Sequence, residues 1–343
     1  LRKVMVCRPG LAQARLTPAN CRELLFDDVL WVSQAKTDHY AFVSAMQDRG
    51  IEVLDMHDLL ADILQGQEAR DWVLERKLSS GTVDLELSAQ LLPWLDEMKA
   101  DELATRPAGG IVRAELPFES TGLLSQCTEP SGFLLPPLPN TLFTRDNSCW
   151  INDGAVLGSM YWPARRQETL LSAAIYRFHP LFSGGTRIWW GGPDVDHGGA
   201  TLEGGDVMPL SHDVVLIGMG ERTSPQGVAQ LARSLFAHES VKHVIAAQLP
   251  RSRGAMHLDT VFTFCDRDLV TIFPEVVDGI RCTSLRPSQR PHALDVRPET
   301  APFLEVVARA LGLKELRTVA TGGDTWEVER EQWDDGNNVI ALA

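Results

Sequence analysis

GAMHLDTVFTFCDRDLVTIF, residues 254–273, has the apolar pattern of a β-hairpin with a buried core. Residues two apart on a strand point to the same face of a sheet, so His257 and Asp259 share one face and the apolar residues around them form the other. An imidazole beside a carboxylate raises the question of proton chemistry. The plain alternative is a strand that turns this face to solvent.

The same pattern recurs along the second half of the chain. Asp146 opens DNSCWIN, Asp206 opens DVMPLSH and Asp259 opens DTVFTFC, and in each case a second Asp follows seven residues later. A fourth copy is predicted to begin at TGGDTWEVER, where Asp324 and Glu331 have the same interval and the hairpin is longer. Equivalent acids at equivalent strand starts indicate an internal repeat.

A helix and then another strand follow each of the first three hairpins. The predicted helices are ARRQETLLSAAIYRF, SPQGVAQLARSLFA and ETAPFLEVVARALG, and the strands after them are TRIWW, KHVIAAQL and LRTVA. Ser224 is the expected N-cap of the second helix, with Pro225 at its first position. A β-β-α-β unit this small cannot bury its own face, so we expect several to assemble around a shared core in an α/β fold. A ring of them would gather the Asp and His residues at one centre.

Residues 55–128 have a different composition from the rest. HDLLADILQGQEARDWVLERKL and TVDLELSAQLLPWLDEMKADEL show helical spacing, many acids and few β-branched residues. We therefore predict an inserted helical domain over 55–128. Residues 1–54 and 129–343 would form the catalytic α/β part, with its last unit incomplete.

Composition narrows the class of protein. The 343 residues are 44% hydrophobic and 23% charged, with a net charge of -14. This balance is typical of a soluble globular protein and argues against nucleic acid or an anionic membrane as a partner. No apolar run reaches the roughly 18 residues of a membrane span, and no signal peptide pattern opens the chain. Because the sequence starts at Leu1 without a Met and stops inside a repeat, we expect it to be a piece of a longer protein. The use of cysteine favours a cytoplasmic location.

The six cysteines show no CxxC pair and no zinc-ligand spacing. Cys7, Cys149 and Cys265 lie within strand-like apolar runs, so buried reduced thiols are the expectation. None of the six has the cationic neighbourhood that activates a thiol, which leaves a catalytic thiol among them as the weaker alternative.

The polar residues near the strand starts suit a small zwitterionic ligand. Carboxylates would face a cationic head, for which a guanidinium is the best match, and arginines would hold a carboxylate tail. His257 is a candidate general acid/base whose tautomer and pKa are set by Glu203. The candidates are Asn140, Asp146, Glu203, His257 and Asp259 at strand starts and Arg165 and Arg222 after second strands. Each has a plain alternative as a turn or surface residue, and Asp206, after two glycines, is read as structural.

A metal site is the weaker alternative for two stretches. DVDHGG, residues 194–199, and HLD both contain residues that bind divalent metals. Neither stretch matches a specific metal motif, and we expect no metal.

Several motifs together resemble the bacterial arginine deiminases. They are FTRD, YWPARRQE, TLEGGDVMP, GMGERTS, AMHLDTVFTFCDRD and EREQWDDGNN, and the resemblance extends along nearly the whole chain. Dimethylargininase, amidinotransferases and agmatine deiminase share the His and the acids. The resemblance implies a pentein-like, five-bladed α/β propeller, L-arginine as the substrate, no cofactor, and a dimer or tetramer.

The resemblance also implies roles. Asp146 and Asp259 would grip the guanidinium, while Glu203 and His257 would form an acid/base pair. L-Arginine would be hydrolysed to L-citrulline and ammonia through a covalent amidino-cysteine.

The rest of the substrate has its own implied partners. Arg165, Arg222 and Asn140 would hold the α-carboxylate end, and Phe143 would stack near the substrate.

The family's nucleophile is a cysteine in a Gly-rich loop near the C-terminus, and the 343 residues do not contain that loop. We expect it beyond Ala343. Two other readings stay open: a non-catalytic arginine-binding relative, or a hydrolase of another guanidine compound such as agmatine or a methylated arginine.

Overall fold

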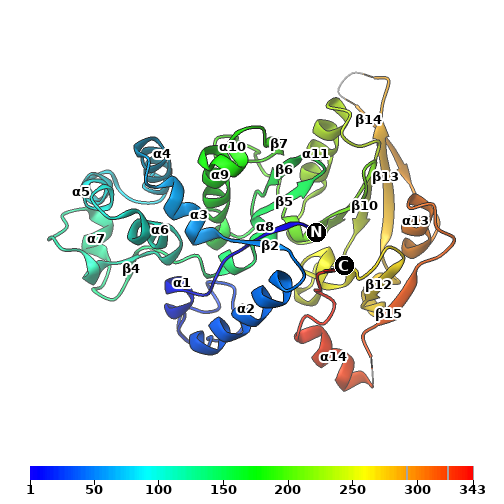
Figure 1. Cartoon of the computed structure of the whole chain (residues 1–343), viewed down its shortest axis with the longest axis horizontal. Coiled ribbons are helices and arrows are strands. Elements are labelled where there is room, and N and C mark those ends of the chain that lie inside the picture. The colour runs from blue at the N-terminus through cyan, green and yellow to red at the C-terminus, as the bar shows by residue number, and fades with distance from the viewer. Residues whose placement is uncertain (291–292, 323, 343) are drawn as a thin grey trace. The chain divides into compact units, whose positions relative to one another are not determined.

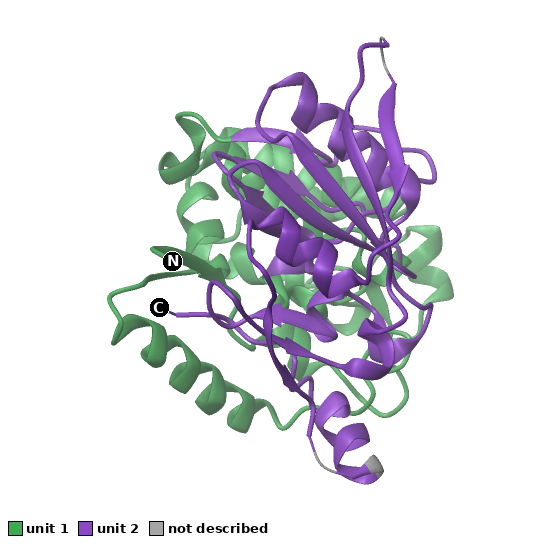
Figure 2. Cartoon of the chain, turned by 90° about the vertical axis from the view of Figure 1, so that its right-hand side faces the viewer, with its two compact units in different colours: residues 1–144, 162–186 green, residues 145–161, 187–343 purple. Residues whose placement is uncertain are grey.

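The computed structural model describes residues 1–290, 293–322 and 324–342. The chain forms two compact units, coloured separately in Figure 2. Unit 1 contains Leu1–Thr144 and Trp162–Thr186, and unit 2 contains Arg145–Tyr161 and Arg187–Ala343. Both combine helices and strands, so the predicted α/β class is confirmed. None of the described helices combines the length and apolarity needed to cross a membrane.

Unit 1 is mainly helical (Figure 1). Its strands are β1 (Lys3–Val6), β2 (Glu52–Asp55), β3 (Ile111–Val112) and β4 (Phe133–Leu135). Its helices are α1 (Leu11–Ala14), α2 (Val32–Gln47), α3 (Met56–Ile63), α4 (Gln67–Lys77), α5 (Leu85–Asp96), α6 (Ala100–Gly109), α7 (Leu123–Cys127), α9 (Glu168–Phe178) and α10 (Pro180–Ser183). Strands β1 and β2 are parallel, β3 and β4 are antiparallel, and α9 packs on α3 and α4.

Helices α3 to α7 occupy most of residues 55–128, as the helical spacing predicts. Asp55 caps α3 by accepting a hydrogen bond from the His57 N–H at 2.8 Å, and Asp84 caps α5 in the same way. That this stretch forms a separate inserted domain stays a prediction.

Unit 2 contains most of the strands. They are β5 (Ser148–Ile151), β6 (Gly154–Leu157), β7 (Arg187–Trp190), β8 (Val207–Ser211), β9 (Val214–Met219), β10 (His243–Gln248), β11 (Phe262–Phe264), β12 (Leu269–Ile272), β13 (Arg281–Pro287), β14 (Leu294–Pro298) and β15 (Arg317–Ala320). Its helices are α11 (Pro225–Ala237), α12 (Pro274–Val277), α13 (Phe303–Ala310) and α14 (Thr325–Trp333), and α8 (Thr144–Asn147) leads into it.

Three modules of unit 2 repeat one pairing rule. A hairpin is antiparallel and its second strand pairs in parallel with a later strand: β5–β6–β7, β8–β9–β10 and β11–β12–β15. The three predicted repeats are therefore present. The hairpin β13–β14, which the sequence pattern did not predict, extends the middle sheet to the order β14–β13–β10–β9–β8. The five-bladed ring stays a prediction.

The middle sheet is buried on both faces. On β9, Val215 and Ile217 pack into one apolar cluster with α11, while Val214 and Leu216 pack into another with β11, β12 and α13. Successive side chains of β9 thus point to opposite faces of the sheet, and each face packs against its own apolar core. Because both faces are buried, the strand VVLIGM is apolar throughout. Ser224 caps α11 with Pro225 at its first position, as predicted.

Two local predictions are wrong. Residues 254–261 are not strand: His257 precedes a single 3₁₀ turn, η6 (Leu258–Thr260), and the hairpin begins only at Phe262. The fourth hairpin is the helix α14, which Asp324 caps by accepting from the Trp326 and Glu327 N–H groups while Glu327 accepts from the Asp324 N–H. This reciprocal capping box, rather than a strand start, is the role of Asp324.

Candidate active site

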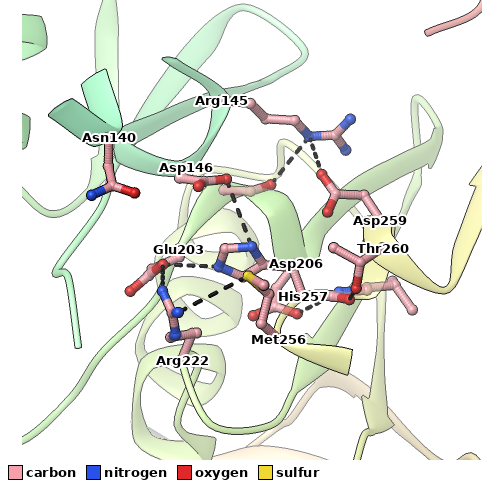
Figure 3. A network of polar contacts seen from close by, with 12 residues as sticks. Asn140, Arg145, Asp146, Glu203, Asp206, Arg222, Met256, His257, Asp259 and Thr260 are labelled. Carbon is pink, nitrogen blue, oxygen red and sulfur yellow. Dashed lines mark hydrogen bonds and ion pairs between the residues drawn. The ribbon is translucent and has the colours of Figure 1, made fainter. Parts of the chain in front are cut away.

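Each module of unit 2 begins with a short helical turn that carries an acid. Asp146 lies in α8, Asp206 in the turn η4 (Gly204–Asp206) and Asp259 in η6, directly before β5, β8 and β11. All three carboxylates are buried. Figure 3 shows that these turns bring their side chains to one place, together with Glu203 and His257.

His257 is the centre of this network. Its Nε2 lies 2.8 Å from Glu203 Oε2, and its Nδ1 lies 3.8 Å from Asp146 Oδ1. His257 is 3% exposed and Glu203 is 0% exposed. Burial alone would lower the pKa of His257, but the carboxylates of Asp146 and Glu203 outweigh it and raise that pKa to about 10. The imidazole is therefore protonated at neutral pH and can donate a proton.

Glu203 is held from several sides. Arg222 Nη1 donates to its Oε2 at 3.4 Å, the Tyr161 N–H donates to its Oε1 at 3.0 Å, and its own N–H donates to Thr223 Oγ1 at 3.1 Å. Arg222, which is itself buried, also contacts Glu221 through Nε at 3.1 Å. These contacts fix the carboxylate that orients the His257 ring.

Asp259 and Asp206 each have one buried carboxylate oxygen without a hydrogen-bond partner among the described residues. In Asp259 this oxygen is Oδ1, while Oδ2 lies 3.5 Å from Arg145 Nε. Burial raises the pKa of Asp259 to about 6, against the opposing effect of Arg145. A cationic ligand would donate a hydrogen bond to Oδ1 and so offset the free-energy cost of burying the ionised carboxylate.

Glycines let these turns approach closely. A Cβ at Gly205 would lie 2.8 Å from the His257 ring, one at Gly204 would lie 1.9 Å from the Arg145 carbonyl oxygen, and one at Gly218 would lie 2.3 Å from Asp206 Oδ1. The φ angles of these three glycines are not in the left-handed region. The glycines of EGGD are therefore needed for space, rather than only for a bend.

The remaining predicted residues lie in unit 1. Asn140 Nδ2 donates to the Leu24 carbonyl oxygen at 2.7 Å, within the ELLFDD stretch, and Phe143 is 48% exposed. Arg165 is buried and binds Glu168 through Nε at 3.0 Å and Nη2 at 2.9 Å, and it also donates to the Asn140 carbonyl oxygen at 3.3 Å. The contact of these residues with a substrate stays a prediction.

Sequence reasoning did not single out Arg145, and it interpreted Asp206, the other further member of the network, as structural. Arg145 directly precedes Asp146 in FTRD and reaches Asp259, and its Nη2 donates to the Val207 carbonyl oxygen at 3.0 Å. Asp206, interpreted as structural, accepts a hydrogen bond from the Leu258 N–H at 2.9 Å. The signal available for both was their proximity in sequence to a predicted site residue: Arg145 directly precedes Asp146, and Asp206 follows Glu203 by three positions.

Three cysteines are poor nucleophiles. Burial raises the pKa of Cys7, Cys149 and Cys282 to about 12, so each stays a thiol at neutral pH.

Three residues of the network are close enough together to bind a metal ion. Ligand atoms of Asp146, Glu203 and His257 lie within 4.8 Å of one another, the one such cluster among the described residues, and DVDHGG contributes nothing to it. In this structure His257 Nε2 is engaged with Glu203 at 2.8 Å, and the absence of a metal stays a prediction.

Solved structures of several enzymes are distantly similar. ArgZ, an arginine dihydrolase from the ornithine–ammonia cycle in cyanobacteria, is 14% identical with a TM-score of 0.38, and the match covers 59% of this chain and 25% of that one. DDAH from Pseudomonas aeruginosa in complex with citrulline is 15% identical with a TM-score of 0.43, covering 96% and 95%. SxtG, an amidinotransferase from Microseira wollei in the saxitoxin biosynthetic pathway, is 12% identical with a TM-score of 0.47, covering 100% and 80%. The chain thus spans about a quarter of the length of ArgZ.

The sequence itself gives the stronger match. The profile that describes arginine deiminase matches residues 22–343, nearly the whole chain, and the protein therefore belongs to the arginine deiminase family.

Proposed function

We propose that this protein is an arginine deiminase that hydrolyses L-arginine to L-citrulline and ammonia. Membership of the family makes hydrolysis of guanidino C–N bonds its chemistry. The observation that carries the finer assignment is the buried His257–Glu203 pair, at 2.8 Å, beside the unsatisfied carboxylate oxygen of Asp259. An acid/base pair next to a buried anion suits a planar cationic substrate whose leaving group must be protonated.

The charge of the network supports a cationic substrate. Its carboxylates exceed its cations by one at neutral pH, and Glu221 at the edge adds another negative charge. The carboxylates are those of Asp146, Glu203, Asp206 and Asp259, and the cations are those of Arg145, Arg222 and His257. A guanidinium would neutralise the excess, whereas the neutral ureido group of citrulline would not, which favours release of the product.

The reaction then proceeds in two balanced steps. A thiolate attacks the guanidinium carbon, the C–N bond breaks, and ammonia leaves with a proton from His257. The neutral imidazole then takes a proton from water, whose oxygen attacks the amidino carbon. The C–S bond breaks to release the thiolate, and the remaining hydroxyl proton passes to solvent, where it converts the released ammonia to ammonium, which leaves neutral citrulline. The nucleophile that we propose is the cysteine of the Gly-rich loop that the family resemblance implies, which the 343 residues do not contain.

One experiment separates this function from its alternatives. The protein, expressed as it is encoded, is mixed with L-arginine, quenched in acid and weighed intact, while citrulline is measured in parallel. Citrulline together with an amidino adduct on a cysteine is the expected result. Binding of L-arginine without citrulline would make the protein a binding relative, and turnover of only agmatine or dimethylarginine would make it another guanidine hydrolase.

The pH profile follows from two side chains. Because Asp259 must be ionised to hold a cation, kcat/KM should rise as pH increases through about 6, and because His257 must donate a proton, it should fall as pH passes about 10. Initial rates from pH 4.5 to 10.5 check this expectation. An acidic midpoint near that of an ordinary aspartate would contradict the assignment to Asp259.

Arg222 is expected to select for the α-carboxylate. Agmatine lacks that group, so Arg222→Ala should lower the ratio of kcat/KM for L-arginine to that for agmatine by roughly 10- to 100-fold, the effect of losing one charge-assisted hydrogen bond. Arg222 also contacts Glu203 at 3.4 Å, so its loss could slow the chemistry of both substrates. The ratio of the two kcat/KM values removes this shared effect. Arg233→Ala, at an exposed position of α11, is the control. An unchanged ratio would show that Arg222 does not bind the carboxylate.

A further inference from the structure

Asp206 occupies a position that the acid/base pair and the guanidinium contacts do not explain. It is 0% exposed, and it lies three residues after Glu203 at the end of η4. Its Oδ1 accepts a hydrogen bond from the Leu258 N–H at 2.9 Å. Figure 3 shows Asp206 beside His257 in the network. Leu258 is the residue between His257 and Asp259, so a single carboxylate oxygen holds the backbone from which both side chains project.

The turn needs such an acceptor. The first N–H groups of a helical turn have no partner within the turn, and a buried N–H left unpaired is costly. Within η6, the Thr260 hydroxyl and N–H both donate to the His257 carbonyl oxygen, at 2.8 and 3.3 Å, and Thr263 Oγ1 donates to the Asp259 carbonyl oxygen at 2.9 Å. Carbonyl groups on both sides are therefore fixed locally, whereas the Leu258 N–H depends on a residue 52 positions away in the sequence.

The packing around Asp206 is built for this contact. Gly218 on β9 leaves the space that the carboxylate occupies, since a Cβ there would lie 2.3 Å from Asp206 Oδ1 and 3.0 Å from Leu258 Cβ. Burial also keeps solvent from competing for the Leu258 N–H. A mere turn-stabilising acid would need neither full burial nor a glycine on the neighbouring strand.

We propose that Asp206 is a positioning residue: its carboxylate holds the Leu258 N–H, which fixes the directions of His257 and Asp259. The inference rests on the proposed function for its purpose, but its contacts can be tested without turnover. Asp206, together with Asp146 and Glu203, is one of the acids that raise the pKa of His257. Burial raises the pKa of Asp206 itself to about 6, so it is mostly ionised at neutral pH.

Two variants separate the acceptor atom from the charge. Asp206→Asn keeps an oxygen acceptor and loses the charge, while Asp206→Ala loses both. NMR measures hydrogen exchange at the Leu258 amide and the titration of the His257 ring. We expect exchange at Leu258 to be about 10- to 100-fold faster in the Ala variant than in the Asn variant, and the His257 midpoint to fall below about 10 in both. Asp213→Asn, at an acid paired with Lys242 on the surface of the same unit, is the control and should change neither.

The outcomes are decisive in either direction. Equal protection of Leu258 in both variants would overturn the positioning role, and a wild-type His257 midpoint in Asp206→Asn would overturn the role of the charge. If Asp206→Ala does not fold, Asp206→Val, which is closer in volume and also lacks an acceptor, takes its place in the comparison with Asp206→Asn. The His257 midpoint of Asp206→Asn still decides the role of the charge. If wild-type protein neither binds nor hydrolyses L-arginine, the proposed function fails while both NMR measurements remain valid tests of Asp206.

Discussion

His257→Ala should slow citrulline formation strongly while L-arginine still binds. General acid/base groups contribute about 10²- to 10⁴-fold to turnover, so kcat should fall by that amount. Affinity should stay the same or increase, because the variant removes a positive charge that lies beside Glu203 and Asp146 and leaves the acids that attract the guanidinium. Steady-state kinetics and equilibrium dialysis with labelled L-arginine give the two quantities separately. Retention of a tenth or more of kcat would exclude His257 as the proton donor.

The same variant has a signature in stability. The pKa of His257 is about 10 in the folded protein, above that of an exposed histidine, so the folded state binds this proton more firmly than the unfolded chain does. That contribution is fully present below about pH 6.5 and is lost as pH rises toward 10. The difference in Tm between wild type and His257→Ala should therefore shrink between pH 7 and pH 10. His212→Ala, at an exposed histidine of the same unit, should show no such trend.

The sequence was sufficient for features that depend on local pattern. Helix α11 begins where Ser224 and Pro225 predict, and the apolar strands β9 and β10 pair in parallel as the repeat requires. Five predicted site residues also come together: Asp146, Glu203, Arg222, His257 and Asp259. Their convergence could be anticipated because the repeat places equivalent acids at equivalent points of successive modules.

Features that depend on distant partners could not be read from the sequence. His257 and Asp259 alternate with apolar residues as in a strand. In the structure, however, the Leu258 N–H between them donates to the Asp206 carboxylate, and the segment forms a turn. Nothing in the spacing of the sequence predicts this contact. The interval between Asp324 and Glu331 likewise resembles that of the hairpins. In the structure, Asp324 and Glu327 form a capping box, and Asp324 precedes a helix rather than a strand. In both cases a side-chain carboxylate paired with backbone N–H groups outweighed the period-two pattern.

Asp259→Asn should weaken the enzyme and stabilise the protein. The carboxylate is buried beside Arg145, and its Oδ1 has no hydrogen-bond partner among the described residues, so a bound guanidinium would supply the missing donor. Replacing it with a neutral amide should raise KM for L-arginine by roughly 10- to 100-fold, the usual worth of a charge-assisted hydrogen bond. Asp153→Asn, at the exposed turn after β5, is the matched control.

Although Asp259→Asn should weaken substrate binding, it should raise the Tm of the protein, and this stabilisation should depend on pH. Burial raises the pKa of Asp259 to about 6 in the folded protein, so below the ordinary aspartate range both states are protonated and the variant should match wild type. As pH rises through about 6, wild type must ionise a buried carboxyl and loses stability that Asp259→Asn keeps. The Tm of the variant should therefore exceed that of wild type at pH 7 but not at pH 4. If Asp259→Asn is less stable than wild type at pH 7, then Arg145 already compensates the charge of the Asp259 carboxylate in the protein without substrate. Asp259 would then have no need of a further cation.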